Sequence, residues 1–202
     1  MSRIYQAVEA LVRGRPVIIT DDSERENEGD LVLPAQLANE HNLTFCLNHG
    51  KGLMCIPCMP EKIEALGIPL SPSNDKDPLK TPFTVSVDAV KGTTTGMSVQ
   101  DRLKTISVFL KPSPSSEDLQ YPGHMFPLRA RPGLLQERRG HTESSLELMK
   151  IGGFEPVAII IEIMNDNGTM KRGAELEFYA KVYDLKIVTI EEIYQHVYNS
   201  RV

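Results

Sequence analysis

The segment from Asp21 to Asp30 carries six carboxylates, with Arg25 as the one basic residue among them. Two interpretations stay open. Like charges repel, which favours a solvated acidic loop. Hard cations such as Mg²⁺, however, take carboxylate oxygens together with water and substrate oxygens, and the spacing is not that of an EF-hand. In a metal site, Arg25 would neutralise the acids or bind a phosphate group through its forked guanidinium.

A second polar segment, RRGHTE at 138–143, has the composition of an anion site. A glycine directly before a helix, flanked by arginine, threonine and backbone donors, suits a phosphate group. Thr142 could equally be a simple helix cap. His141 is a candidate metal ligand or acid–base group, although a lone histidine is more often structural.

A third candidate is Glu162, which lies within the very apolar run 156–164. An unpaired carboxylate is costly to bury, and burial would raise its pKa and make it a plausible general acid or base. The alternative is a strand end that reaches the surface. His124, in GHMFPLRA, is a second possible acid–base group. The hydroxyls of KGTTTG at 91–96 could bind a sugar or a phosphate, but this motif alone is weak.

The three cysteines are Cys46, Cys55 and Cys58, an odd number that provides no disulfide framework. Cys55 and Cys58 have the spacing of a redox pair or half a zinc site. No second pair completes a zinc set, so two small apolar residues on a strand are the favoured interpretation.

Composition is that of a globular protein, with 41% hydrophobic residues and a net charge of −5. The negative charge argues against a nucleic-acid partner, because such a partner needs a basic face. No apolar run approaches a membrane span, and the N-terminal stretch MSRIYQAVEALVRG lacks the apolar core that a signal peptide needs. We therefore expect a cytoplasmic protein with reduced thiols.

Strand and helix patterns alternate along the chain, which predicts a single α/β (α+β) domain over residues 1–202. We expect a mixed, twisted β-sheet flanked by helices. The acidic segment connects two apolar strands. Flexible connections are expected at 67–82 and 111–123. The predicted strands are 16–20, 30–35, 52–58, 83–90, 156–164 and 186–190, and the predicted helices are 4–12, 39–50, 60–67, 98–110, 142–150, 174–184 and 191–199.

Five motifs in this order, spread over nearly the whole chain, resemble the 3,4-dihydroxy-2-butanone 4-phosphate synthases of riboflavin biosynthesis. They are DDSERENEGDL, FTVSVDAVKGTTTGMSVQDR, GHMFPLRA, RRGHTE and EIMNDNGTM. The resemblance is to the monofunctional form. It implies an Mg²⁺-dependent lyase that converts D-ribulose 5-phosphate to 3,4-dihydroxy-2-butanone 4-phosphate and formate. It also implies a homodimer with sites at the interface.

The resemblance further implies roles for individual residues. Glu26 and His141 are the expected metal ligands, and His124 and Glu162 the expected acid–base pair. We expect Asp30 to take part in proton transfer, and Mn²⁺ to replace Mg²⁺ because a histidine ligand suits it. The expected substrate-binding residues are Arg25, Glu26, Asp30, Thr95, Arg138, Arg139, Gly140, His141, Thr142 and Glu162.

The implied chemistry is formation of an enediolate, a skeletal rearrangement and loss of C4 as formate. Metal stabilises the developing charge as a Lewis acid, and each proton step needs a group that titrates near neutral pH. Two alternatives remain: another metal-dependent sugar-phosphate isomerase or aldolase, which would release no formate, and a nucleotide- or RNA-binding module.

Overall fold

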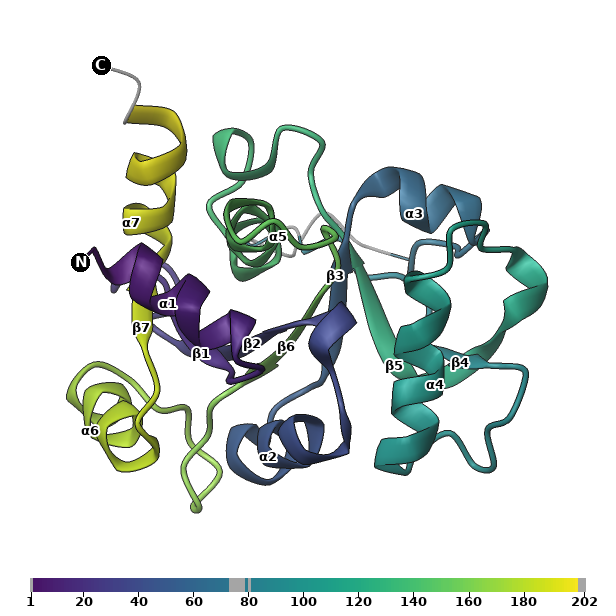
Figure 1. The fold of residues 1–202 in the computed structure, drawn as a ribbon, viewed down its shortest axis with the longest axis horizontal. Coiled ribbons are helices and arrows are strands. Elements are labelled where there is room, and N and C mark those ends of the chain that lie inside the picture. The colour runs from purple at the N-terminus through teal and green to yellow at the C-terminus, as the bar shows by residue number, and fades with distance from the viewer. Residues whose placement is uncertain (1, 73–78, 80, 200–202) are drawn as a thin grey trace.

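The computed structural model of the chain describes residues 2–72, 79 and 81–199, and confirms an α/β fold with a mixed sheet flanked by helices (Figure 1). Much of the expected flexible connection at 67–82 lies outside the described residues. Within the described part, seven strands form one sheet in the order β4-β5-β3-β6-β2-β1-β7. These strands are β1 (Val17–Thr20), β2 (Gly29–Pro34), β3 (Cys55–Cys58), β4 (Val87–Ala89), β5 (Leu119–Arg129), β6 (Ala158–Glu162) and β7 (Ile187–Thr189).

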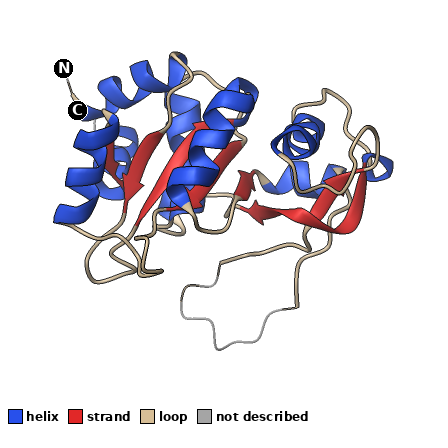
Figure 2. Ribbon diagram, turned by 90° about the horizontal axis from the view of Figure 1, so that it is seen from below, coloured by secondary structure: helices blue, strands red, loops and turns tan. Residues whose placement is uncertain are grey.

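The helices lie in two layers, each packed on its own apolar core (Figures 1 and 2). One layer holds α1 (Arg3–Val12), α5 (His141–Ile151) and α7 (Ile190–Tyr194). The other holds α2 (Glu40–Gly50), α3 (Pro60–Ala65), α4 (Val99–Phe109) and α6 (Ala174–Tyr183). A short π-helical turn, Gln195–Asn199, follows α7. No helix in the described part of the chain is long and apolar enough to cross a membrane.

Side-chain alternation decides which face of the sheet each strand residue reaches. On β2, Leu31 and Leu33 join the core under α2 and α6, whereas Val32 joins the core under α5. Asp30 has the parity of Val32, and Glu162 has the parity of Ile160, which also packs under α5. Both carboxylates therefore belong to the sheet face that α5 covers.

The strand β5 was not predicted, and the expectation of a flexible connection over 111–123 was wrong for its last part. Leu119–Arg129 forms an eleven-residue strand, the longest of the sheet. Its first half pairs with β4 and its second half with β3. Pro122 and Pro127 made a strand unexpected from the sequence, because proline is rare inside sheets. Pairing on both sides of this long strand overrides that preference.

Helix starts follow local rules in most places. Ser98 caps α4 by accepting a hydrogen bond from the Asp101 backbone. The interpretation of Thr142 as a cap was wrong: Gly140 is the N-cap of α5, and Thr142 is buried in the first turn. The three cysteines are free and buried, and Cys55 and Cys58 lie on a strand as expected.

Candidate metal and substrate site

The acidic segment is the connection of an antiparallel hairpin between β1 and β2, closed by the Thr20–Gly29 pair. The buried side chain of Asp21 holds the backbone of this loop through hydrogen bonds. Its side chain is 1% exposed, and it accepts hydrogen bonds from the backbone nitrogens of Glu26 (3.0 Å) and Glu28 (2.8 Å). The Arg25 guanidinium donates to Asp21 at 2.9 Å and also to Glu26. The backbone of the loop and Arg25 therefore surround the carboxylate of Asp21, and the interpretation as a solvated acidic loop was wrong.

His141 is the first residue of α5 and brings its imidazole to this loop. Its Nδ1 lies 3.3 Å from a carboxylate oxygen of Glu26. The ring is almost completely buried, yet its Nε2 has no hydrogen-bond partner in the described part of the chain. An orphaned nitrogen of this kind is unusual in a folded protein and suits a metal ligand.

Asp21, Glu26 and His141 together could hold one metal ion, since a ligand atom from each lies within 4.8 Å of the others. Two carboxylate oxygens and one imidazole nitrogen suit Mn²⁺ well, and Mg²⁺ when water and substrate oxygens complete its shell. The residues therefore fit the expected cation. Asp21 was not a predicted ligand.

The electrostatics of this cluster are strongly perturbed. Burial raises the pKa of Glu26, but the hydrogen bond from His141 and the charge of Arg25 outweigh it and hold the pKa at about 2. Burial lowers the pKa of His141, but the carboxylates of Asp30, Glu26 and Asp21 outweigh it and raise the pKa to about 9. In the metal-free protein, Glu26 and His141 therefore form an ion pair at neutral pH.

Asp30 is a buried carboxylate beside this cluster. It is 3% exposed, and burial together with the nearby charges of Glu162, Glu26 and Glu28 raises its pKa to about 7, against the opposing effect of His141. A carboxyl group that titrates near neutral pH can both give and take a proton during turnover. The predicted acid–base role thus has its strongest physical support at Asp30.

Glu162 differs from the expectation of a buried carboxylate, because it is partly exposed at the end of β6. Its carboxylate accepts a hydrogen bond from the Leu53 backbone nitrogen at 2.7 Å. Gly52 makes this contact possible: a Cβ there would lie 2.3 Å from the same oxygen. The turn before β3 therefore fixes the Glu162 side chain beside Asp30, its partner in the β2–β6 register.

The RRGHTE segment is built around a buried ion pair. Arg138 donates to Glu143 at 2.7 Å, and its other donors go to the Leu79 carbonyl and the Thr81 hydroxyl. Gly140 is required here, since a Cβ would lie 2.1 Å from the guanidinium. Arg138 thus holds the start of α5 in place, and the backbone of this start is the part available to an anion.

The remaining predicted substrate residues lie at the surface. Arg139 pairs with Glu191 and stacks over the Tyr194 ring at 3.4 Å from its centroid. Thr95 is exposed in the loop before α4. Neither residue contacts the Glu26–His141 cluster through a hydrogen bond or ion pair in the part of the chain described.

His124 lies on the half of β5 that pairs with β4, and no hydrogen bond or ion pair among the described residues joins it to Glu162. Its partner is Asp88 of β4, whose carboxylate lies 2.7 Å from the ring Nδ1. The pairing of His124 with Glu162 as acid and base therefore stays a prediction. Asp88 was missed by the sequence reasoning, although a carboxylate inside the strand-like run VSVDAV was a visible signal.

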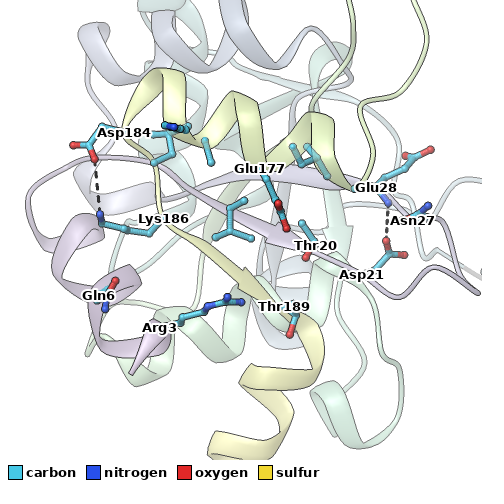
Figure 3. A pocket seen from close by; sticks show the side chains of 16 residues that line it. Arg3, Gln6, Thr20, Asp21, Asn27, Glu28, Glu177, Asp184, Lys186 and Thr189 are labelled. Atoms are coloured by element: carbon cyan, nitrogen blue, oxygen red, sulfur yellow. Dashed lines mark hydrogen bonds and ion pairs between the residues drawn. The ribbon is translucent and has the colours of Figure 1, made fainter. Parts of the chain in front are cut away.

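A cavity of about 700 Å³ lies behind the hairpin, between α6, β7 and α1 (Figure 3). Asp21, Asn27 and Glu28 line its hairpin end, and Arg3 and Lys186 lie toward the other end. It includes none of Glu26, Asp30, His141 or Glu162. Of the three residues that could hold a metal ion, Asp21 alone lines this cavity.

Comparisons with known proteins agree with the motifs. Residues 5–196 match the family described as 3,4-dihydroxy-2-butanone 4-phosphate synthase. The chain is 42% identical over 197 residues to the 3,4-dihydroxy-2-butanone 4-phosphate synthase of Agrobacterium fabrum, covering 98% of this chain and 92% of that one. A relative with the same name from Desulforamulus reducens is 41% identical, covering 95% and 88%.

Among solved structures, the fold is similar to a 3,4-dihydroxy-2-butanone 4-phosphate synthase crystallised in complex with two magnesium ions. The TM-score is 0.91 at 36% identity, and the match covers 99% of this chain and 98% of that one.

Proposed function

Because the chain belongs to the 3,4-dihydroxy-2-butanone 4-phosphate synthase family, we propose that it converts D-ribulose 5-phosphate to 3,4-dihydroxy-2-butanone 4-phosphate and formate in riboflavin biosynthesis. The observation that carries this proposal is the meeting of Glu26 and His141 at 3.3 Å, from segments more than a hundred residues apart. That contact brings the two most polar motifs of the sequence into one site.

The proposed cofactor is Mg²⁺, with Mn²⁺ able to replace it, held by Glu26 and His141 and assisted by Asp21. The orphaned Nε2 of His141 and the ionised Glu26 support this assignment. Bound there, a divalent cation would supply Lewis-acid stabilisation of negative charge on the substrate. The crystal complex of a relative with two magnesium ions agrees with a need for metal.

The side chains around this position suit the proton steps. Asp30 is buried and titrates near pH 7, so we assign to it removal and return of the C3 proton of the ketose. Glu162 lies opposite Asp30, and its carboxylate accepts a hydrogen bond from the Leu53 backbone nitrogen. We assign to Glu162 the role of the acid that assists loss of the C1 hydroxyl. The start of α5, where Gly140 and Thr142 follow Arg138 and Arg139, is the proposed phosphate site. Arg25 and Thr95 complete the proposed set of substrate contacts.

The decisive experiment is a formate assay with the purified protein, ribulose 5-phosphate and Mg²⁺. Formate released in proportion to enzyme, and lost on chelation of the metal, is the expected result. Interconversion of pentose phosphates without formate would replace the proposal with an isomerase, and binding of RNA at low salt without turnover would replace it with a nucleic-acid module.

We further propose a homodimer in which each site takes His124 from the second copy. Two observations support this: His124 pairs with Asp88 rather than with Glu162, and Met97 and Tyr121, in the same region of the fold, are more than half exposed. Large exposed apolar side chains often mark interfaces. The free cysteines agree with the reducing cytoplasm as its location.

Complementation tests the dimer. The variants H124A and E26Q should each be inactive. Mixed and refolded together, they should regain part of the wild-type activity, because some dimers then contain one intact site. No recovery, with a monomer in sedimentation analysis, would refute shared sites.

A further inference from the structure

Asp88 is a buried carboxylate that lies outside the metal cluster and has no role in the chemistry described so far. It is 3% exposed. One carboxylate oxygen accepts the backbone N–H of His124 at 2.9 Å, and the other lies 2.7 Å from Nδ1 of the same histidine. Both oxygens thus serve a single residue, which fixes the imidazole in position and in rotation.

This contact decides which ring nitrogen is available. An ionised carboxylate only accepts hydrogen bonds, so the Nδ1 that faces it must carry the hydrogen. The Nε2 of a neutral ring is then left with its lone pair free. The His124 side chain is 42% exposed, so Nε2 is the nitrogen able to reach a ligand. Orientation of a histidine by hydrogen bonding at its other nitrogen is a general device of functional sites.

The loop before α4 closes over this pair. A Cβ on Gly96 would lie 2.0 Å from an Asp88 oxygen and 2.6 Å from Nδ1 of His124. Gly96 is held there by Asp101, whose carboxylate accepts its backbone N–H at 3.1 Å and the Thr94 hydroxyl at 2.7 Å. The backbone at Gly96 therefore packs against the Asp88–His124 contact, and the buried carboxylate of Asp101 holds this backbone in place.

We propose that Asp88 is a positioning residue that holds His124 in the Nδ1–H tautomer and so makes Nε2 the atom that exchanges a proton with the substrate. This inference rests on the proposed function for the identity of the substrate. When Nε2 takes a proton, the broken bond leaves its electron pair on the substrate and the ring becomes an imidazolium. The carboxylate of Asp88, 2.7 Å from Nδ1, offsets that positive charge.

The variant Asp88→Asn tests the tautomer directly. The asparagine oxygen can still accept the His124 backbone N–H, but its amide group donates to Nδ1 and favours the Nε2–H tautomer. We expect kcat to fall by roughly 10²- to 10⁴-fold while KM changes by less than about threefold. A kcat within about threefold of wild type would overturn the proposal.

Ser86→Ala is the matched control. Ser86 accepts the backbone N–H of Gly123 at 3.1 Å, so its loss removes a neighbouring hydrogen bond to β5 without touching the ring of His124. We expect kcat to stay within about threefold of wild type. A loss as large as that of Asp88→Asn would show that Asp88 is merely structural.

A double variant separates positioning from folding. If Asp88 acts through His124, then Asp88→Asn should cause little further loss in an H124A background, since residues that act as a unit are not additive. A full additional loss in the double variant would assign Asp88 a separate role.

The tautomer itself is measurable in the wild-type protein by ¹⁵N NMR of the imidazole, without any turnover. Protonated Nδ1 and unprotonated Nε2 are expected, with the reverse in Asp88→Asn. Protonated Nε2 in the wild type would refute the inference even if the enzyme releases formate. Absence of formate with Nδ1–H present would refute the proposed function alone.

Discussion

Asp30 on β2 lies directly opposite Glu162 on β6, so two carboxylates share one face of the sheet across a single pair of strands. Directly opposed like charges destabilise a sheet. Asp30 is also buried and its pKa is raised to about 7 by that burial and by its acidic neighbours. A perturbed carboxyl group of this kind is typical of functional sites, which agrees with the proton transfer proposed for Asp30.

Asp30→Asn tests the importance of this pair. The substitution keeps the size of the side chain but removes the ionisable carboxyl group to which we assign the proton exchange. We expect formate production to fall by about 10²- to 10⁴-fold, as for loss of a general acid–base group. Steady-state kinetics of formate release measures it. Thermal unfolding serves as the control, because the metal-free variant should be at least as stable as wild type once a buried charge is gone.

Glu26→Gln tests the metal site. Loss of one charged ligand should weaken Mn²⁺ or Mg²⁺ binding by at least about tenfold, measured by calorimetry on the chelator-treated protein. Glu24→Gln is the matched control because Glu24 is an exposed acid of the same loop. Equal weakening in both variants would mean that the loop attracts cations only through its total charge.

Glu143→Ala tests the ion pair that holds the start of α5. Glu143 is fully buried and Arg138 is 11% exposed. Removing one partner of a buried pair costs about 3–5 kcal/mol of unfolding free energy. Glu191→Gln breaks the exposed pair with Arg139 and should cost under about 1 kcal/mol. Urea unfolding distinguishes the two, and similar costs would contradict the structural role of Arg138.

Gly52→Ala tests how Glu162 is held. The new Cβ would collide with the Glu162 carboxylate at 2.3 Å and with its backbone oxygen at 2.9 Å. We expect kcat to fall at least about tenfold as Glu162 moves off its position. Gly168→Ala, at a glycine with open space around it and a φ of +85°, controls for a glycine substitution that strains the backbone without a collision with Glu162. Unchanged kcat in Gly52→Ala would argue against a catalytic Glu162.

The variant Asp101→Asn should lose stability to an extent that depends on pH. The hydrogen bond from Thr94, supported by Gly96 and Ser98, holds the pKa of Asp101 at about 2. An aspartate in an unfolded chain has a pKa of about 4, so the folded state gains stability from the ionised form above that pH and loses it as pH falls towards 2. The variant should therefore melt at a lower temperature at pH 7, and the difference should shrink between about pH 4 and pH 2. A constant difference would contradict this origin.

The sequence by itself determined the family, the alternation of strands and helices, and most of the polar residues of the metal site. These are local properties. The acids of the hairpin are adjacent in the chain, and the β-branched run of β6 and the Ser98 cap depend on neighbouring residues alone. Glu26, Asp30 and His141 could therefore be named before any coordinates.

The tertiary structure decided the partnerships, because they join residues far apart in the chain. Asp21 enters the cluster only because the hairpin folds its backbone around that carboxylate. β5 forms despite its prolines because strands pair on both of its sides. All three residues of β4 are buried, and the register of β4 against β5 shifts at Val87–Asp88. Asp88 meets His124 across this strand pair, which no local pattern encodes.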